Sequence, residues 1–189
     1  MAKKRGMSRR DFFRAGWLGA TGFGLLGFGG ASIGMLWPSL RGGFGSKINL
    51  GNVADLKAAL AATPGGVLYF AEARTYLVTW RPVSPAAAAI YDNIGLPDEE
   101  LLAVYQKCAH LGCKVPHCET SNWFECPCHG SRYNKAGEYE YGPAPVGLSH
   151  FPLVVDGGSV TVDTAAPEPG PPRGADTINQ DPEGPHCEG

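Results

Sequence analysis

Two short boxes rich in cysteine and histidine constrain this chain more than any other feature of its sequence. The first reads CAHLGC over 108–113 and the second reads CPCHGS over 126–131. Each box offers one Cys–His pair and one further cysteine, and fifteen residues separate His110 from Cys126. We therefore predict two loops that approach one common metal centre, each giving one sulfur and one nitrogen.

A structural zinc ion is the first alternative, because zinc also takes two cysteines and two histidines. Its paired ligands normally lie two to four residues apart, whereas one residue separates Cys108 from His110. Zinc would also leave Cys113 and Cys128 without a role, and disulfides alone would leave both histidines unused. A heme attachment needs Cys-x-x-Cys-His, which the sequence lacks.

The two boxes closely resemble the C-T-H-L-G-C and C-P-C-H-G-S motifs of Rieske iron–sulfur proteins. Residues 142–145, Gly-Pro-Ala-Pro, match the proline loop that covers the cluster in that family. Ala109 takes the place of the usual threonine, at a position that is not a ligand. The resemblance spans about 47–163 and is strongest over 101–155. It implies an all-β, Rieske-type antiparallel sandwich with a small cluster-binding subdomain at about 106–147.

Carried over residue by residue, the resemblance implies one Rieske-type 2Fe–2S cluster. Cys108 and Cys126 would bind one iron, and His110 and His129 would bind the other and present the catalytic edge to quinol. With neutral imidazoles the oxidised centre is uncharged, so adding an electron is easier than with four thiolates. The other family positions, which would donate to the cluster, shield it or cover it, are Ser131, Tyr133, Leu111, Gly142 and Pro143.

Four cysteines are not ligands in that pattern. In the respiratory branch of the family the positions of Cys113 and Cys128 form a disulfide that staples the two cluster loops, which implies the same bridge here. Cys118 and Cys187 are then left over. In an oxidising compartment two spare thiols tend to pair, and such a bridge would contribute about 4–5 kcal/mol in the chain-entropy model. The alternative is a free Cys187, or one bonded to a partner subunit.

The N-terminus has the features of an exported, membrane-anchored protein. Residues 8–14 read SRRDFFR, which looks like a twin-arginine signal, and residues 1–14 carry a net charge of +5. The uncharged run 17–37 would span roughly 30 Å as a helix, which is one hydrocarbon core. We expect a retained single-pass anchor with a cytoplasmic N-terminus and an extracytoplasmic Rieske domain. A cleaved signal peptide is the alternative.

The rest of the chain divides by composition. We expect a cytoplasmic segment at 1–16, the anchor at 17–37, a glycine-rich hinge at 38–47, the Rieske domain at 48–164 and a disordered, proline-rich tail at 165–189. Within the domain the patterns predict a helix at 53–62, strands at 67–71, 75–80 and 101–106, and a hairpin of 151–156 with 159–163. Residues 82–98 should form an irregular insert with a weak helix over 85–91.

These features favour the Rieske subunit of a quinol–cytochrome c oxidoreductase, an enzyme only as part of its complex. Its partners would be a cytochrome b-type subunit, a c-type cytochrome, quinol and the membrane. The runner-up is the small Rieske subunit of arsenite oxidase, and the third class is a zinc-stabilised domain without redox activity. The net charge of −2 argues against nucleic-acid binding. The length of 189 residues leaves no room for the mononuclear iron domain of a Rieske oxygenase.

Overall fold

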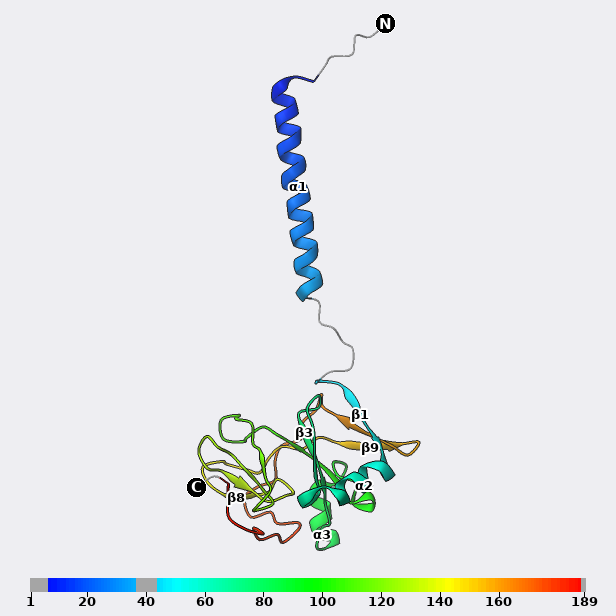
Figure 1. The fold of residues 1–189 in the computed structure, drawn as a ribbon, viewed down its shortest axis with the longest axis vertical. Helices are drawn as coiled ribbons and strands as arrows, with labels where there is room; N and C mark the ends of the chain where they lie inside the picture. The colour runs from blue at the N-terminus through cyan, green and yellow to red at the C-terminus, as the bar shows by residue number, and fades with distance from the viewer. Residues whose placement is uncertain (1–6, 37–43, 188–189) are drawn as a thin grey trace. The chain divides into compact units, whose positions relative to one another are not determined.

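The computed structural model describes residues 7–36 and 44–187 of the chain. The chain divides into two compact units, Met1–Arg41 and Gly42–Gly189 (Figure 1). The predicted residues Trp37, Gly42 and Gly43 lie outside the described ranges.

In the first unit, one long helix, α1, spans Arg9–Leu36. Ser8 begins it as an N-cap, because its hydroxyl accepts the N–H of Asp11 at 3.2 Å and donates to the Asp11 carboxylate at 2.6 Å. The helix thus starts at the twin arginines rather than at Trp17, and none of its described residues is buried. By length and composition α1 could cross a membrane, as the apolar run predicted.

The second unit is built mainly from short antiparallel strands, with helices at their connections. Its larger elements are β1 (Lys47–Asn52), α2 (Val53–Ala62), β2 (Val67–Phe70), β3 (Thr75–Thr79), α3 (Pro85–Ala88), β4 (Leu101–Tyr105), β9 (Leu153–Asp156) and β10 (Ser159–Asp163). The smaller strands are β5 (His117–Cys118), β6 (Trp123–Glu125), β7 (Arg132–Tyr133) and β8 (Tyr139–Tyr141). Single 3₁₀ turns, η1 to η3, lie at Pro64–Gly66, Ala89–Tyr91 and Pro97–Glu99.

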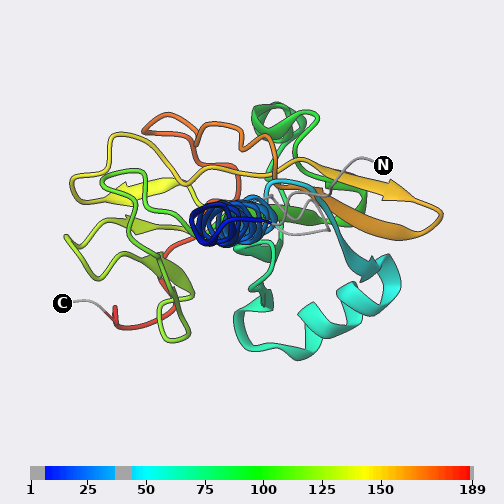
Figure 2. The same ribbon diagram turned by 90° about the horizontal axis from the view of Figure 1, so that it is seen from above.

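Within residues 44–187 these strands form three antiparallel sheets, ordered β1-β10-β9, β2-β3-β4 and β5-β6-β7-β8. In the middle sheet, β3 and β4 are buried on both faces, and alternate residues of each strand point to opposite sides. Leu101 and Ala103 of β4 join the apolar cluster formed with β1, β10 and α2. Leu102 and Val104 join a second cluster that contains Cys108 and Cys126. The β9–β10 hairpin and β8 accordingly lie at opposite ends of the unit (Figure 2).

Most of the predicted elements are confirmed to within two residues. The helix α2 begins after Asn52, whose side chain accepts the Ala54 N–H at 2.9 Å as an N-cap, and Pro85–Tyr91 forms α3 followed by η2. The strands β5 to β8 were not predicted, since each is only two or three residues long and too short to show a period.

The predicted hinge at 38–47 is wrong at its C-terminal end. The N–H groups of Gly45 and Ser46 donate to the hydroxyl of Thr164 at 2.8 and 3.1 Å, and Lys47 is the first residue of β1, opposite Asp163. These bonds make residues 45–47 part of the folded unit.

The predicted disorder of residues 165–189 is also wrong, over the described residues 165–187. Glu168 and His150 form a β-bridge, as do Pro172 and Val146, and Thr177 is fully buried. The tail has few large apolar side chains, but hydrogen bonds and a disulfide between Cys187 and Cys118 hold it in place. It runs along the end of the unit that carries β5 to β8 (Figures 1 and 2).

His150 is a buried histidine that ties the middle sheet to the β7–β8 turn. Its Nε2 donates to the carbonyl of Ala136 at 2.7 Å, and its ring packs against Tyr91 with centroids 4.6 Å apart. Burial lowers the pKa of His150 to about 4, so the ring is neutral in the folded chain at neutral pH.

This lowered pKa predicts an acid-dependent loss of stability. Between pH 6.5 and 4 the unfolded chain binds a proton at His150 that the folded chain does not. The stability that neutral His150 contributes is therefore fully present above pH 6.5 and is lost as the pH drops toward 4. Over this range the loss is about 3 kcal/mol. In urea titrations, His150→Gln should therefore be less stable than the unsubstituted protein at pH 7 by a gap that narrows toward pH 4. A gap that stays constant with pH would contradict the assignment.

Candidate metal centre

The two boxes fold into the same turn. In each box the N–H of the leading cysteine donates to the carbonyl of the sixth residue, from Cys108 to Cys113 and from Cys126 to Ser131, both at 2.8 Å. A glycine in the fifth position donates back to the cysteine carbonyl at 3.0 Å in both turns. These glycines, Gly112 and Gly130, have φ of +81° and +69°, a conformation that side chains disfavour.

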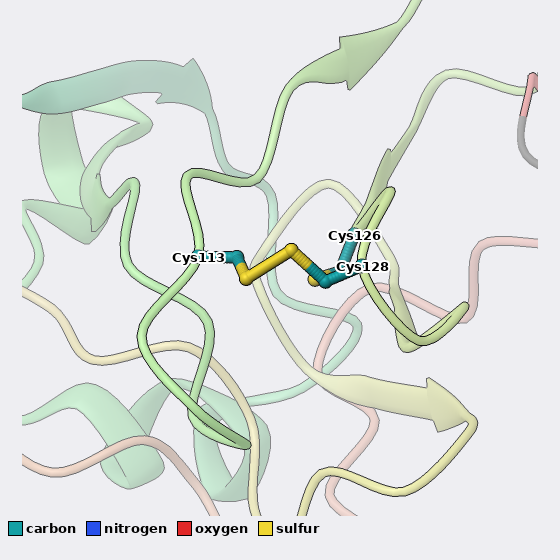
Figure 3. Close-up of side chains that lie close together, drawn as sticks. All are labelled: Cys113, Cys126 and Cys128. Atoms are coloured by element: carbon teal, nitrogen blue, oxygen red, sulfur yellow. A yellow bond between two sulfur atoms is a disulfide. The ribbon is translucent and has the colours of Figure 1, made fainter.

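The disulfide Cys113–Cys128 joins the two turns, with Cα atoms 6.7 Å apart. It crosses between the loops with Cys126 beside Cys128 (Figure 3), and the three sulfur atoms lie within 4.8 Å of one another. Sulfurs already bonded to each other supply no thiolate. Among the described residues this leaves Cys108 and Cys126 as the free cysteines, and both are buried.

The Cys126 thiol lies in an environment that disfavours its charged form. Burial raises the pKa of Cys126, and the neighbouring Cys108 side chain raises it further, while backbone N–H groups of Cys128 and His129 offset part of this. A buried pair of thiols is a poor place for lone anions but a suitable place for thiolates bound to a cation, because metal binding removes their protons.

The two histidines of the boxes face each other across the same region. The rings of His110 and His129 lie nearly perpendicular, with centroids 4.8 Å apart. Nδ1 of His110 is buried without a hydrogen-bond partner among the described residues. Such an orphaned nitrogen is costly unless a ligand occupies it, so the histidine pair fits the nitrogen half of a metal centre.

Two thiols and two imidazoles, brought together by turns of one design, match the donor set of a Rieske-type 2Fe–2S cluster. The sulfurs come from the buried first position of each turn. The histidines lie nearer the surface, since His129 is exposed and His110 half-buried. Leu111, next to His110 in the first turn, is 71% exposed, so in this structure it presents its side chain to solvent.

Hydroxyl groups predicted to support the cluster lie against the ligand positions. The hydroxyl oxygen of Tyr133, on β7, is 3.3 Å from Sγ of Cys108. Burial and then Cys108 raise the pKa of Tyr133, which keeps its proton available for donation to a thiolate. Ser131 is buried, and its oxygen accepts the N–H of Ala144 at 3.2 Å, which leaves its own proton free to donate.

The predicted proline loop, residues 142–145, packs directly on the second box. A Cβ on Gly142 would lie 2.6 Å from Cα of Ser131 and 2.8 Å from the Gly130 carbonyl, so only glycine fits this approach. The hydroxyl of Tyr139 donates to the Gly142 carbonyl at 2.6 Å, and Pro143 is exposed. Tyr139 was missed because an aromatic next to a charged turn carries no sequence signal of its own.

The other histidines lie outside this centre. His117 contacts the Asn122 side chain at 2.9 Å, and His186 donates from Nδ1 to the buried Glu125 carboxylate at 2.7 Å. His150 serves the core, as described above. All three therefore have local roles outside the centre.

Comparison with known proteins gives one family for this chain. Residues 69–152 match the model of the Rieske [2Fe-2S] domain. The chain is 33% identical over 169 residues to the cytochrome b6-f complex iron–sulfur subunit of Cyanothece sp., covering 82% of this chain and 83% of that protein.

Two solved structures are similar at 26% identity. The plasma-membrane Rieske protein PetC3 of Synechocystis PCC 6803 matches with a TM-score of 0.40, over 61% of this chain and 97% of that one. A chain of a hyperthermophilic respiratory Complex III matches with a TM-score of 0.42, over 78% of this chain and 97% of that one.

The assignment of ligands predicts a selective loss of iron. Cys126→Ser should reduce bound iron and acid-labile sulfide to background, because a serine oxygen replaces a thiolate poorly at a sulfur-ligated iron. The matched control is Cys118→Ser with Cys187→Ser, which removes two disulfide-bonded sulfurs and should keep two irons and two sulfides per chain. Iron retained in Cys126→Ser, or stoichiometric zinc in the unsubstituted protein, would refute the assignment.

Proposed function

Because this chain belongs to the Rieske [2Fe-2S] protein family, we propose that it is the electron-transfer subunit of a quinol–cytochrome c oxidoreductase. It takes one electron from a quinol and passes it to a c-type cytochrome, within a complex that also holds a cytochrome b-type subunit. The observation that carries the proposal is the pair of matching turns, which brings two free thiols and two imidazoles to one place. The relatedness to a cytochrome b6-f subunit supports quinol oxidation over the arsenite oxidase alternative.

Each ligand residue has a separate task in this proposal. Cys108 and Cys126 hold one iron and His110 and His129 the other, and a 2Fe–2S cluster bound there supplies reversible one-electron transfer. A histidine that binds metal through one ring nitrogen leaves the second free. That second nitrogen, near the surface at His129, carries an ionisable proton; once the oxidised centre has released this proton, the nitrogen would accept a hydrogen bond and a proton from the quinol as the centre takes the electron.

The surrounding residues tune this exchange. Donation from Tyr133 to the Cys108 sulfur is stronger when the centre carries more negative charge, so the bond favours the reduced state. Ser131 is placed to act in the same sense, since its proton is not used by Ala144. Leu111, exposed at the tip, offers an apolar contact to the membrane-borne substrate or to the partner subunit.

Membrane attachment is part of the proposal. The helix α1 serves as a signal anchor, with Arg9 and Arg10 on the cytoplasmic side and the Rieske domain on the outer face of the cell membrane. This orientation would place the histidines where a quinol in the outer leaflet and a c-type cytochrome outside can both be reached.

The experiment is isolation of the full chain from native membranes under mild detergent. We expect b-type and c-type cytochromes to co-purify, and the complex to reduce cytochrome c with quinol. His129→Ala should lower this rate at least about a hundredfold, because it removes both an iron ligand and a substrate contact. Co-purification of a molybdenum subunit with arsenite-dependent reduction would instead support the runner-up.

The supporting hydroxyls predict a change in potential without loss of the cluster. Tyr133→Phe and Ser131→Ala should each lower the midpoint potential, since each removes a donor that favours the reduced centre. Redox titration followed by the EPR signal of the reduced cluster measures this. Tyr69→Phe is a matched control for the tyrosine, because its hydroxyl donates to the Gln106 side chain at 2.7 Å and not to a cysteine of the boxes. Equal potentials in all of these proteins would remove the two hydroxyls from the site.

A further inference from the structure

The C-terminal segment 165–187 lies against the loops of the candidate metal centre, although no ligand comes from it. It enters as a partner of the proline loop. The N–H of Gly147 donates to the Pro171 carbonyl at 2.8 Å, and Val146 and Pro172 form a β-bridge. Residues 171–173 therefore run directly beside residues 142–147.

Within this segment, the side chain of Arg173 hydrogen-bonds the backbone of the proline loop, residues 142–145. Its Nε donates to the Ala144 carbonyl at 3.1 Å, its Nη2 donates to the same carbonyl, and Nη2 also reaches the Gly142 carbonyl at 3.3 Å. The guanidinium lies over the Tyr139 ring, 4.1 Å from the centroid. The Tyr139 hydroxyl bonds the same Gly142 carbonyl, so two side chains hold one loop by its carbonyls.

The part of the proline loop that Arg173 holds is in direct contact with Ser131 of the second box. Arg173 holds the carbonyls of Gly142 and Ala144, which lie on either side of the Pro143–Ala144 peptide bond. The N–H of that peptide, on Ala144, donates to the Ser131 hydroxyl. Gly142 itself is packed against the Ser131 backbone. A loop that moves away from this position withdraws the donor that orients Ser131 and admits water to the buried side of the turn.

Other contacts, which do not involve Arg173, attach the rest of the segment to the folded unit. The N–H of Thr177 donates to both carboxylate oxygens of the buried Glu138 at 3.0 Å, and the Trp80 indole donates to the Thr177 hydroxyl at 3.1 Å. The disulfide to Cys118 fixes the other end. Arg173 therefore projects from a backbone fixed on its C-terminal side at Thr177 and Cys187.

We infer that Arg173 is a positioning residue for the metal centre: by holding the Gly142 and Ala144 carbonyls it orients the Ser131 hydroxyl and raises the reduction potential of the cluster. The guanidinium adds a fixed positive charge on the same side, which also favours the reduced state. The inference rests on the proposed cluster at Cys108 and Cys126, but it concerns a residue that no cluster motif contains.

The test uses the full-length holoprotein in detergent, with redox titration followed by EPR. Arg173→Gln should lower the ratio of reduced to oxidised protein at a fixed ambient potential about tenfold, which is about 59 mV for one electron. Arg173→Lys keeps the charge but cannot donate to two carbonyls from one planar group, and should give a smaller fall. The control is Arg81→Gln, which removes the same charge from an exposed ion pair with Glu100 and should leave the potential unchanged.

A second readout separates positioning from charge. Hydrogen exchange of residues 142–147 should become faster in Arg173→Gln and in Arg173→Lys, but not in Arg81→Gln, because the grip on the carbonyls is lost. A potential in Arg173→Gln equal to that of Arg81→Gln would overturn the inference. The inference would also be overturned if Arg173→Lys had the midpoint potential of the unsubstituted protein and the same hydrogen exchange at residues 142–147, since charge alone would then account for the effect.

The inference can still be tested if one variant fails to bind the cluster. If Arg173→Gln fails to load iron, Arg173→Lys is read together with Tyr139→Phe, which removes the hydroxyl bonded to Gly142 while keeping the ring under the guanidinium. A lowered potential in both supports the inference, and unchanged potentials in both overturn it. An unsubstituted protein without a Rieske-type EPR signal would count against the proposed function itself, which keeps the two failures distinguishable.

Discussion

The candidate centre depends on holding two separate turns of the chain in register, so that two thiols outside any disulfide and two imidazoles come to one place. The disulfide Cys113–Cys128 joins the turns by sulfurs that cannot bind metal, and the internal hydrogen bonds of each turn use only backbone atoms. The orphaned Nδ1 of His110 and the two buried thiols are therefore held near one another without a metal ion. A site organised in this way loses little conformational freedom when it takes up its metal, because its geometry is set beforehand.

The middle sheet is the foundation for this arrangement. Its residues alternate between two apolar clusters, one shared with β1, β10 and α2 and one shared with Cys108, Cys126 and Tyr133. The first turn follows β4 directly, while the second lies between β6 and β7 of the four-stranded sheet. Burial on both faces of β3 and β4 therefore fixes where the first turn begins, and the disulfide fixes the second turn relative to it.

Sequence reasoning was most successful where chemistry depends on spacing. The two boxes could be read from residue types and intervals, and the longer strands from their apolar runs. The proline loop and the Cys113–Cys128 bridge followed from the resemblance to Rieske proteins, and the Cys118–Cys187 bridge was one of two alternatives for the remaining cysteines. The tail could not, because proline and glycine content reports local preference and not the partners that a segment will find. Thr177 is ordered by the carboxylate of Glu138, and Arg173 by carbonyls of residues 142 and 144. In both cases one partner is a backbone group, the Thr177 N–H or a loop carbonyl, and such partners leave no trace in the sequence.

The bridge between Cys118 and Cys187 has a consequence for the order in which the protein can be made. The strand β1 pairs with β10 more than a hundred positions later in the chain, and Cys118 must wait for a residue 69 positions further on. Contacts of such long range form late, so the growing chain exposes the apolar residues of β1 until β10 has been synthesised. A chain that stops short of Cys187 leaves Cys118 as a spare thiol in the unit that carries the metal-binding turns.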